Sequence, residues 1–145
     1  MTASAADHRA EIIAVTLALD AAGMVPNKSG NVSCRITEGF AITPAGVPYR
    51  ELLPQHIVTV ALDAPAPATA ARPSSEWRMH AAIYRARPEV TAIVHTHSPR
   101  ATALASAGRG IPPFHYMIAL AGGDVRCTPY ATFGTPELAD SAVRG

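Results

Sequence analysis

The spacing of apolar and polar positions along the chain predicts a mixture of helices and strands. Apolar residues recur at broadly helical spacing over residues 7–22, with Asp7 as a candidate N-cap and Gly23 as a stop signal. Three short β-rich runs follow, separated by turn residues: NVSCRI, GFAIT and HIVTVAL. These runs predict neighbouring strands of one mixed or antiparallel sheet.

A proline-rich stretch separates these strands from the second half of the chain. Residues 63–73 (DAPAPATAARP) show no periodicity and predict a surface loop. Ser74 and Ser75 then offer N-cap hydroxyls for a helix through EWRMHAAIYRAR, which Pro88 terminates. The strand VTAIVHTH is predicted to follow at once.

Two further helices are predicted towards the end of the sequence. One begins at Ser98, has a proline in its first turn and ends at Gly108. The other begins at Thr135 with the same capping pattern. Helices packed against a sheet indicate an α/β or α+β single domain.

Length and charge narrow the class of protein. The chain has 145 residues, 48% apolar content and a formal net charge of +1, which is typical of one globular domain. No basic block suggests a nucleic-acid partner, and no stretch predicts a signal peptide or a membrane span, so we expect a cytoplasmic protein. Cys34 and Cys127 are too few for a disulfide framework and are interpreted as buried thiols.

Two histidines close to the end of a predicted strand are the first candidates for chemistry. In an extended strand His95 and His97 project to the same side, with Cβ atoms roughly 6 to 7 Å apart, so they could share one metal ion. The alternative is a pair of ordinary hydrogen-bonded residues. Glu76, in the first turn of the preceding helix, is a candidate third ligand, or a carboxylate that only favours the helix dipole.

Glycine-containing turns supply a second candidate site. NKSGNVS (27–33) and TPAGVPY (43–49) place glycines among small polar residues, and Ser74 and Ser75 open a helix. Backbone N–H groups of such turns and helix starts can bind a phosphate, although ordinary turns use the same residues.

Six segments together resemble the class II aldolase/adducin family in order and spacing: SGNVS, ITPAGVPY, PSSEWRMH, AIVHTHSPRATALA, IPPFHYMIALAGG and YATFGTPEL. The resemblance implies αβα layers around a central, mainly antiparallel sheet. It also implies a homotetramer with active sites between subunits. The implied activity is a zinc-dependent aldolase that cleaves a ketose 1-phosphate such as L-fuculose 1-phosphate to dihydroxyacetone phosphate and an aldehyde.

The resemblance also implies roles for individual residues. His95 and His97 match zinc ligands, and Glu76 matches a carboxylate that ligates zinc at rest and serves as acid/base. Tyr116 matches a tyrosine that reaches a neighbouring subunit's site and protonates the departing aldehyde oxygen. The residues that match the substrate-phosphate pocket are Gly30, Asn31, Ala45, Gly46, Ser74 and Ser75.

Two departures from the family pattern qualify this interpretation. Position 45 is Ala where the pattern usually has Thr. The family's third zinc histidine is expected beyond residue 145, so residues 1–145 are expected to be the N-terminal two thirds of the domain. Another zinc enzyme of sugar phosphates on this scaffold, an epimerase or dehydratase, stays open, as does an inactive adducin-like interaction module. Glu76 favours the aldolase because the epimerase relatives tend to carry Asp there.

Overall fold

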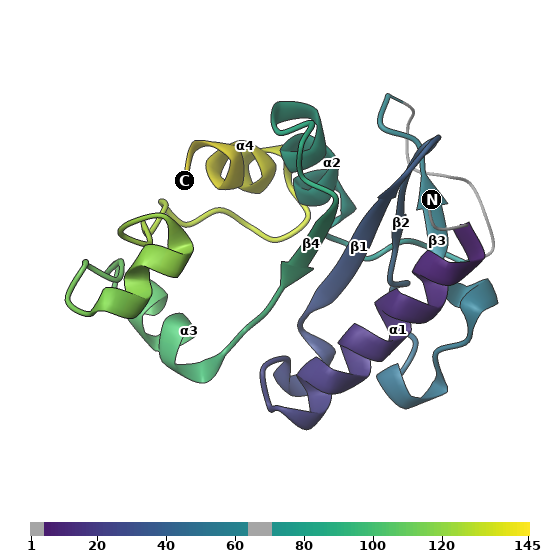
Figure 1. Ribbon diagram of the computed structural model, residues 1–145, viewed down its shortest axis with the longest axis horizontal. Helices are drawn as coiled ribbons and strands as arrows, with labels where there is room; N and C mark the ends of the chain where they lie inside the picture. The colour runs from purple at the N-terminus through teal and green to yellow at the C-terminus, as the bar shows by residue number, and fades with distance from the viewer. Residues whose placement is uncertain (1–4, 64–70) are drawn as a thin grey trace.

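A four-stranded antiparallel sheet is the middle layer of the computed structural model, which describes residues 5–63 and 71–145 (Figure 1). β1 pairs with both β2 and β4, and β2 pairs with β3. The order across the sheet is therefore β3-β2-β1-β4. The strands are β1 (Asn31–Ile36), β2 (Gly39–Ile42), β3 (Val58–Val60) and β4 (Ala92–His95).

Helix α1 (Ala5–Ala21) covers one face of the sheet (Figure 1). Its Ile12 is fully buried and belongs to a cluster with Val32 and Ala41. Because side chains alternate along a strand, Cys34 lies on the same face of β1 as Val32. This layer is held by apolar packing, as the helical periodicity predicts.

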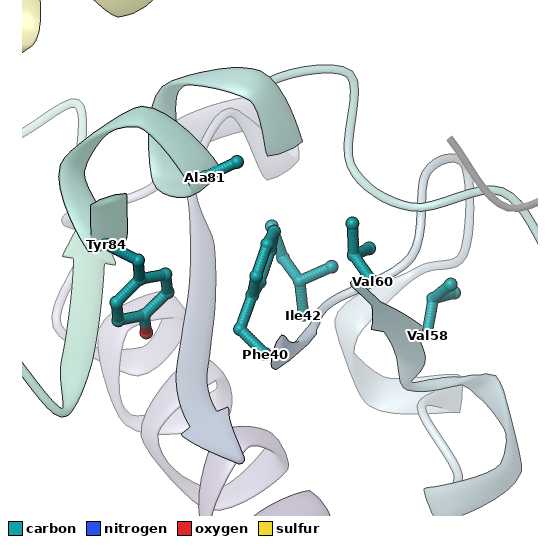
Figure 2. Close-up of a cluster of buried hydrophobic side chains, with 6 residues drawn as sticks. All are labelled: Phe40, Ile42, Val58, Val60, Ala81 and Tyr84. Carbon is teal, nitrogen blue, oxygen red and sulfur yellow. The ribbon is translucent and has the colours of Figure 1, made fainter. Parts of the chain in front are cut away.

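Helix α2 (Trp77–Ala86) covers the opposite face. The buried cluster between α2 and the sheet is shown in Figure 2 and consists of Phe40, Ile42, Val58, Val60, Ala81 and Tyr84. The rings of Phe40 and Tyr84 lie 5.3 Å apart between centroids, within the range of favourable aromatic contacts. The two helix layers around an antiparallel sheet confirm the predicted αβα architecture.

The remaining elements extend from one edge of this sandwich. Helix α3 (Pro99–Ser106) follows β4, and α4 (Pro136–Arg144) packs against α2 (Figure 1). Thr135 caps α4 as predicted, because its Oγ1 accepts a hydrogen bond from the Leu138 N–H. The short 3-10 helices are η1 (Pro26–Lys28), η2 (Tyr49–Glu51), η3 (Pro54–His56) and η4 (Tyr116–Ala121). None of the helices in the described ranges is long and apolar enough to cross a bilayer.

Several predicted boundaries were wrong by a few residues. The first helix begins at Ala5, so Asp7 lies inside it and is not its N-cap. The third strand begins at Val58, because a proline-initiated 3-10 turn takes up the three residues that end at His56. Helix α2 begins after Glu76, which occupies the cap position predicted for the serines.

Three further expectations concern residues near the sheet edge and the cysteines. β4 ends at His95, so His97 lies beyond the strand and is held there by a hydrogen bond from its N–H to the Met24 carbonyl. Cys34 and Cys127 are free thiols, but each is half-buried and not fully buried. Of the loop predicted over residues 63–73, residues 64–70 lie outside the described part of the chain.

Candidate active site

A polar cavity of about 190 Å³ lies where the chain before β1, the turn after β2 and the chain before α2 meet. All six residues predicted for a phosphate pocket line this cavity: Gly30, Asn31, Ala45, Gly46, Ser74 and Ser75. Glu76 lines it as well. Pockets for whole small molecules measure about 300 to 1,000 Å³, so this one suits a compact polar group such as a phosphate.

Backbone hydrogen bonds explain why the turn after β2 and the segment before α2 meet. The Ala45 N–H donates to the Arg72 carbonyl at 2.9 Å, and the Ser74 N–H donates to the Thr43 carbonyl at 3.0 Å. The chain that enters α2 therefore runs antiparallel to the end of β2. As a result, the serines before α2 lie opposite the glycine turn at residues 45–46.

Gly30 allows β1 to start directly beside the end of β4. A Cβ atom at this position would stand 2.2 Å from Val25 Cγ1 and 2.6 Å from the His95 carbonyl oxygen. The contact with the His95 carbonyl could be relieved in a larger residue only by a shift of the backbone. The Gly30 carbonyl also accepts a hydrogen bond of 2.7 Å from the Tyr49 hydroxyl. This close approach places the cavity next to the histidine pair.

Lys28 and Ser29 line the same cavity, and neither was singled out from the sequence. Ser29 Oγ is buried and makes no hydrogen bond to any described residue. Lys28 is the only lysine in the sequence. Both residues belong to the turn NKSGNVS, which the sequence already indicated as a candidate for phosphate binding, so they could have been predicted. An unpaired hydroxyl and an ammonium group in a polar cavity are suited to an anionic ligand.

The predicted metal ligands Glu76 and His95 are in direct contact, as are His95 and His97. Glu76 Oε2 lies 3.2 Å from His95 Nε2, and His95 Nε2 lies 3.0 Å from His97 Nε2. Burial lowers the pKa of His95 below its ordinary value; Glu76 opposes this shift, and His97 adds to it. A neutral imidazole has a free nitrogen lone pair, which is the form that binds a metal ion.

A buried chain of hydrogen bonds supports Glu76 from behind. Asn31 Nδ2 donates to Glu76 Oε2 at 2.8 Å, which leaves Asn31 Oδ1 to accept from His80 Nε2. His80 Nδ1 then accepts from the Ser33 hydroxyl at 2.7 Å. Ser33 Oγ in turn accepts from the Tyr84 hydroxyl at 2.8 Å. Every donor in this chain points towards the carboxylate, so the chain fixes the position of Glu76.

The protonation states in this chain follow from burial. Burial, and to a smaller extent the charge of His95, lower the pKa of His80 to about 3, so its ring is neutral near pH 7. Burial raises the pKa of Tyr84 to about 12, so its hydroxyl keeps its proton. His80 lies within α2 and is completely buried, so it acts through its two hydrogen bonds and not by contact with solvent.

Tyr116 is the one predicted site residue that lies apart from the others. It begins η4, its side chain does not line the polar cavity, and the residue is 79% exposed. Several neighbours are also exposed apolar residues: Phe114, Met117 and Leu120. The structure therefore brings together Glu76, the histidine pair and the six cavity residues, and leaves Tyr116 on the surface.

Comparison with known proteins gives named relatives for this fold and site. The chain is 46% identical over 136 residues to a 5-methylthioribulose-1-phosphate/5-deoxyribulose-1-phosphate aldolase of Escherichia coli O45:K1, covering 93% of this chain and 63% of that protein. It is 45% identical over 132 residues to L-fuculose phosphate aldolase of Escherichia coli K12, covering 90% of this chain and 60% of the relative. The chain thus spans about three fifths of the length of these curated relatives.

Solved structures and family models agree with these relatives. The structure of an L-fuculose 1-phosphate aldolase superimposes with a TM-score of 0.88 at 37% identity, covering 100% of this chain and 70% of that one. The model of the family described as Class II Aldolase and Adducin N-terminal domain matches residues 10–145, and this chain therefore belongs to that family.

Proposed function

We propose that the chain acts as a zinc-dependent aldolase, a lyase that cleaves a ketose 1-phosphate between C3 and C4 into dihydroxyacetone phosphate and an aldehyde. The observation that carries this proposal is the position of Glu76, which contacts His95 and also lines the polar cavity. A group able to ligate a metal and to move a proton thus borders the place suited to the substrate phosphate. The names of the relatives, aldolases of sugar phosphates, support the same reaction class.

Glu76, His95 and His97 would hold the zinc ion. Two nitrogens on one tetrahedral zinc lie about 3.3 Å apart, close to the 3.0 Å between His95 Nε2 and His97 Nε2. The hydrogen bond from Asn31 to Glu76 is of the kind that orients metal ligands. When bound, zinc would supply Lewis-acid chemistry to the substrate oxygens beside the bond that breaks. A third histidine ligand is predicted beyond residue 145.

The polar cavity would hold the phosphate group of the substrate. This group stays on the dihydroxyacetone phosphate fragment and takes no part in bond cleavage, so its binding serves orientation. Lys28 and the unpaired Ser29 hydroxyl would add to the six residues predicted for this role. Ala45 lacks the hydroxyl that the family pattern usually has at this position, which bears on substrate preference.

Cleavage requires two proton transfers. The C4 hydroxyl loses its proton as the C3–C4 bond breaks, and C3 of the ketone fragment gains one. We assign the proton at C3 to Glu76, whose side chain is only 10% exposed and borders the cavity. The proton at the aldehyde oxygen is assigned to Tyr116. Protonation of that oxygen, the role implied by the resemblance, belongs to the condensation direction, and in cleavage the same group would take the proton from the C4 hydroxyl.

Release of dihydroxyacetone phosphate is the test of this function. Zinc-loaded protein would be incubated separately with L-fuculose 1-phosphate, 5-deoxyribulose 1-phosphate and 5-methylthioribulose 1-phosphate. The dihydroxyacetone phosphate released would be measured by its enzymatic reduction in a coupled assay. We expect release from at least one substrate, and none after treatment with a chelator. An isomeric sugar phosphate without cleavage would indicate an epimerase on this scaffold, and no product from any substrate would contradict the proposal.

Replacing Lys28 with glutamine should raise KM by about tenfold or more and leave kcat nearly unchanged, because one charge-assisted contact to the phosphate is lost. Steady-state kinetics with the preferred substrate measure both values. The matched control is Arg100→Gln, which removes an exposed cation outside the cavity. A large loss of kcat with little change in KM would contradict the assignment of Lys28 to phosphate binding.

We propose that the active enzyme is a homotetramer in which Tyr116 serves a neighbouring subunit. Its 79% exposure and its absence from the cavity lining support this proposal. The variants Tyr116→Phe and His95→Ala are each expected to be inactive alone. Refolded together, they should regain activity, since some interfaces then combine an intact Tyr116 with an intact His95.

The control for this experiment is the double variant, with both substitutions in one chain, refolded with Tyr116→Phe. It should stay inactive. Native mass spectrometry would verify that mixed oligomers form in both cases. Mixed oligomers without recovered activity would rule out the action of Tyr116 across an interface.

A further inference from the structure

A second group of metal-binding side chains lies on the other face of the sheet. Among the described residues, His8, Glu11 and Cys34 form the only set of three whose ligand atoms all lie within 4.8 Å of one another. His8 Nδ1 and Glu11 Oε2 are 3.2 Å apart. These three residues offer an imidazole nitrogen, a carboxylate oxygen and a thiol sulfur.

The fold explains how this group forms. His8 and Glu11 are three residues apart on α1, so they are neighbours on one face of that helix. Cys34 projects from β1 towards α1. Its two cross-strand partners are Ala41 on β2 and Ala92 on β4, both with small side chains.

This group is separate from the candidate active site. Asn31 and Ser33 point to the α2 face, where they join the hydrogen-bond chain to Glu76. Cys34 is the next residue after Ser33 and therefore points to the α1 face. The sheet itself separates the two groups of side chains.

We propose that His8, Glu11 and Cys34 form a binding site for a divalent transition-metal ion, with zinc as its occupant. A tetrahedral zinc ion with three protein ligands takes a water as its fourth ligand, and a sulfur ligand favours zinc over magnesium or calcium. The side chain of Glu11 is 63% exposed and that of His8 is 25% exposed, so an ion can reach the site from solvent.

The ion would connect α1 to the sheet. Burial, and secondarily Glu11, raise the pKa of the Cys34 thiol, so the sulfur carries no charge in the absence of a cation. Binding at this site would stabilise the folded chain, because the unfolded chain does not hold the three groups together.

Cobalt titration tests the proposal, since a cobalt–thiolate bond produces a charge-transfer absorption band. We expect this band in the unmodified protein and in the matched control Cys127→Ser, and its loss in Cys34→Ser. His8→Ala should weaken cobalt binding by about tenfold or more, as even the loss of a group that only orients a metal ligand does. His56→Ala, a control on the 3-10 helix η3, should leave binding unchanged.

A second measurement needs no variant. Zinc should slow the alkylation of Cys34 by a thiol reagent and leave that of Cys127 unchanged, with the modified residue identified by mass spectrometry. No band in the unmodified protein, a band that persists in Cys34→Ser, or unprotected Cys34 would each overturn the proposal and leave His8 and Glu11 as an ordinary ion pair. The band should persist in His95→Ala, so failure here is distinguishable from failure of the proposed aldolase.

Discussion

Replacing Glu76 with glutamine is expected to lower kcat for dihydroxyacetone phosphate release by about 10²- to 10⁴-fold, the usual contribution of a general acid/base. Glutamine keeps the size of the side chain and can still contact Asn31, but it can neither accept a proton nor neutralise a metal ion. Initial rates at saturating substrate and zinc measure the effect.

The matched control for this prediction is Glu137→Gln, which removes a carboxylate from the first turn of α4. It should change kcat little. The unfolding midpoint of the Glu76 variant should stay close to that of the unmodified protein, so that lost activity is not lost folding. A Glu76→Gln protein with nearly full activity would contradict the assigned role.

Replacing His80 with alanine is expected to lower the free energy of unfolding by about 3 to 5 kcal/mol, through a cavity and the loss of two buried hydrogen bonds. The Ser33 hydroxyl would lose the acceptor of its proton and keep only the bond from Tyr84, and Asn31 Oδ1 would lose its donor. Urea unfolding measures the loss. His115→Ala, at an exposed histidine, is the control and should cost about 1 kcal/mol or less. A loss as small as that of the control would show that these hydrogen bonds contribute little to the stability of the folded protein.

The same residue predicts a pH dependence, which serves as a second test if His80→Ala does not fold. The pKa of His80 is about 3 in the folded chain, against an ordinary value of 6.5. Between these values the unfolded chain binds a proton that the folded chain does not, so stability falls as pH falls. Between about pH 7 and about pH 5, His80 alone should lower the free energy of unfolding by about 2 kcal/mol. A His80→Gln variant should lose this part of the slope, and an unchanged slope would contradict the assignment.

Local sequence signals predicted the elements of the fold well, and tertiary contacts set their ends. NVSCRI matches β1 residue for residue, because a run bounded by turn residues on both sides defines its own limits. The strand expected from His56 begins later, since Pro54 favours a tight turn that spacing alone does not reveal. His97 was expected within a strand but lies past its end, where Met24 holds its backbone.

The site residues that belong to a recognisable sequence motif could be predicted from the sequence. The six cavity residues and the contacts of His95 agree with positions matched by resemblance. The series of hydrogen bonds from Tyr84 through His80 to Glu76 was not predictable. It joins α2 to β1 through contacts between residues that are 45 to 51 positions apart in the sequence. The same holds for Cys34, which meets His8 and Glu11 only because α1 packs across β1.

Zinc content per chain is the measurement that tests the central claim most directly. Elemental analysis would compare Cys34→Ser, which lacks the second site proposed on the α1 face, with the double variant Cys34→Ser/His95→Ala. About one zinc per chain in the first protein and none in the second is the predicted result. No zinc in Cys34→Ser, or equal zinc in both, would contradict a metal site built from Glu76, His95 and His97.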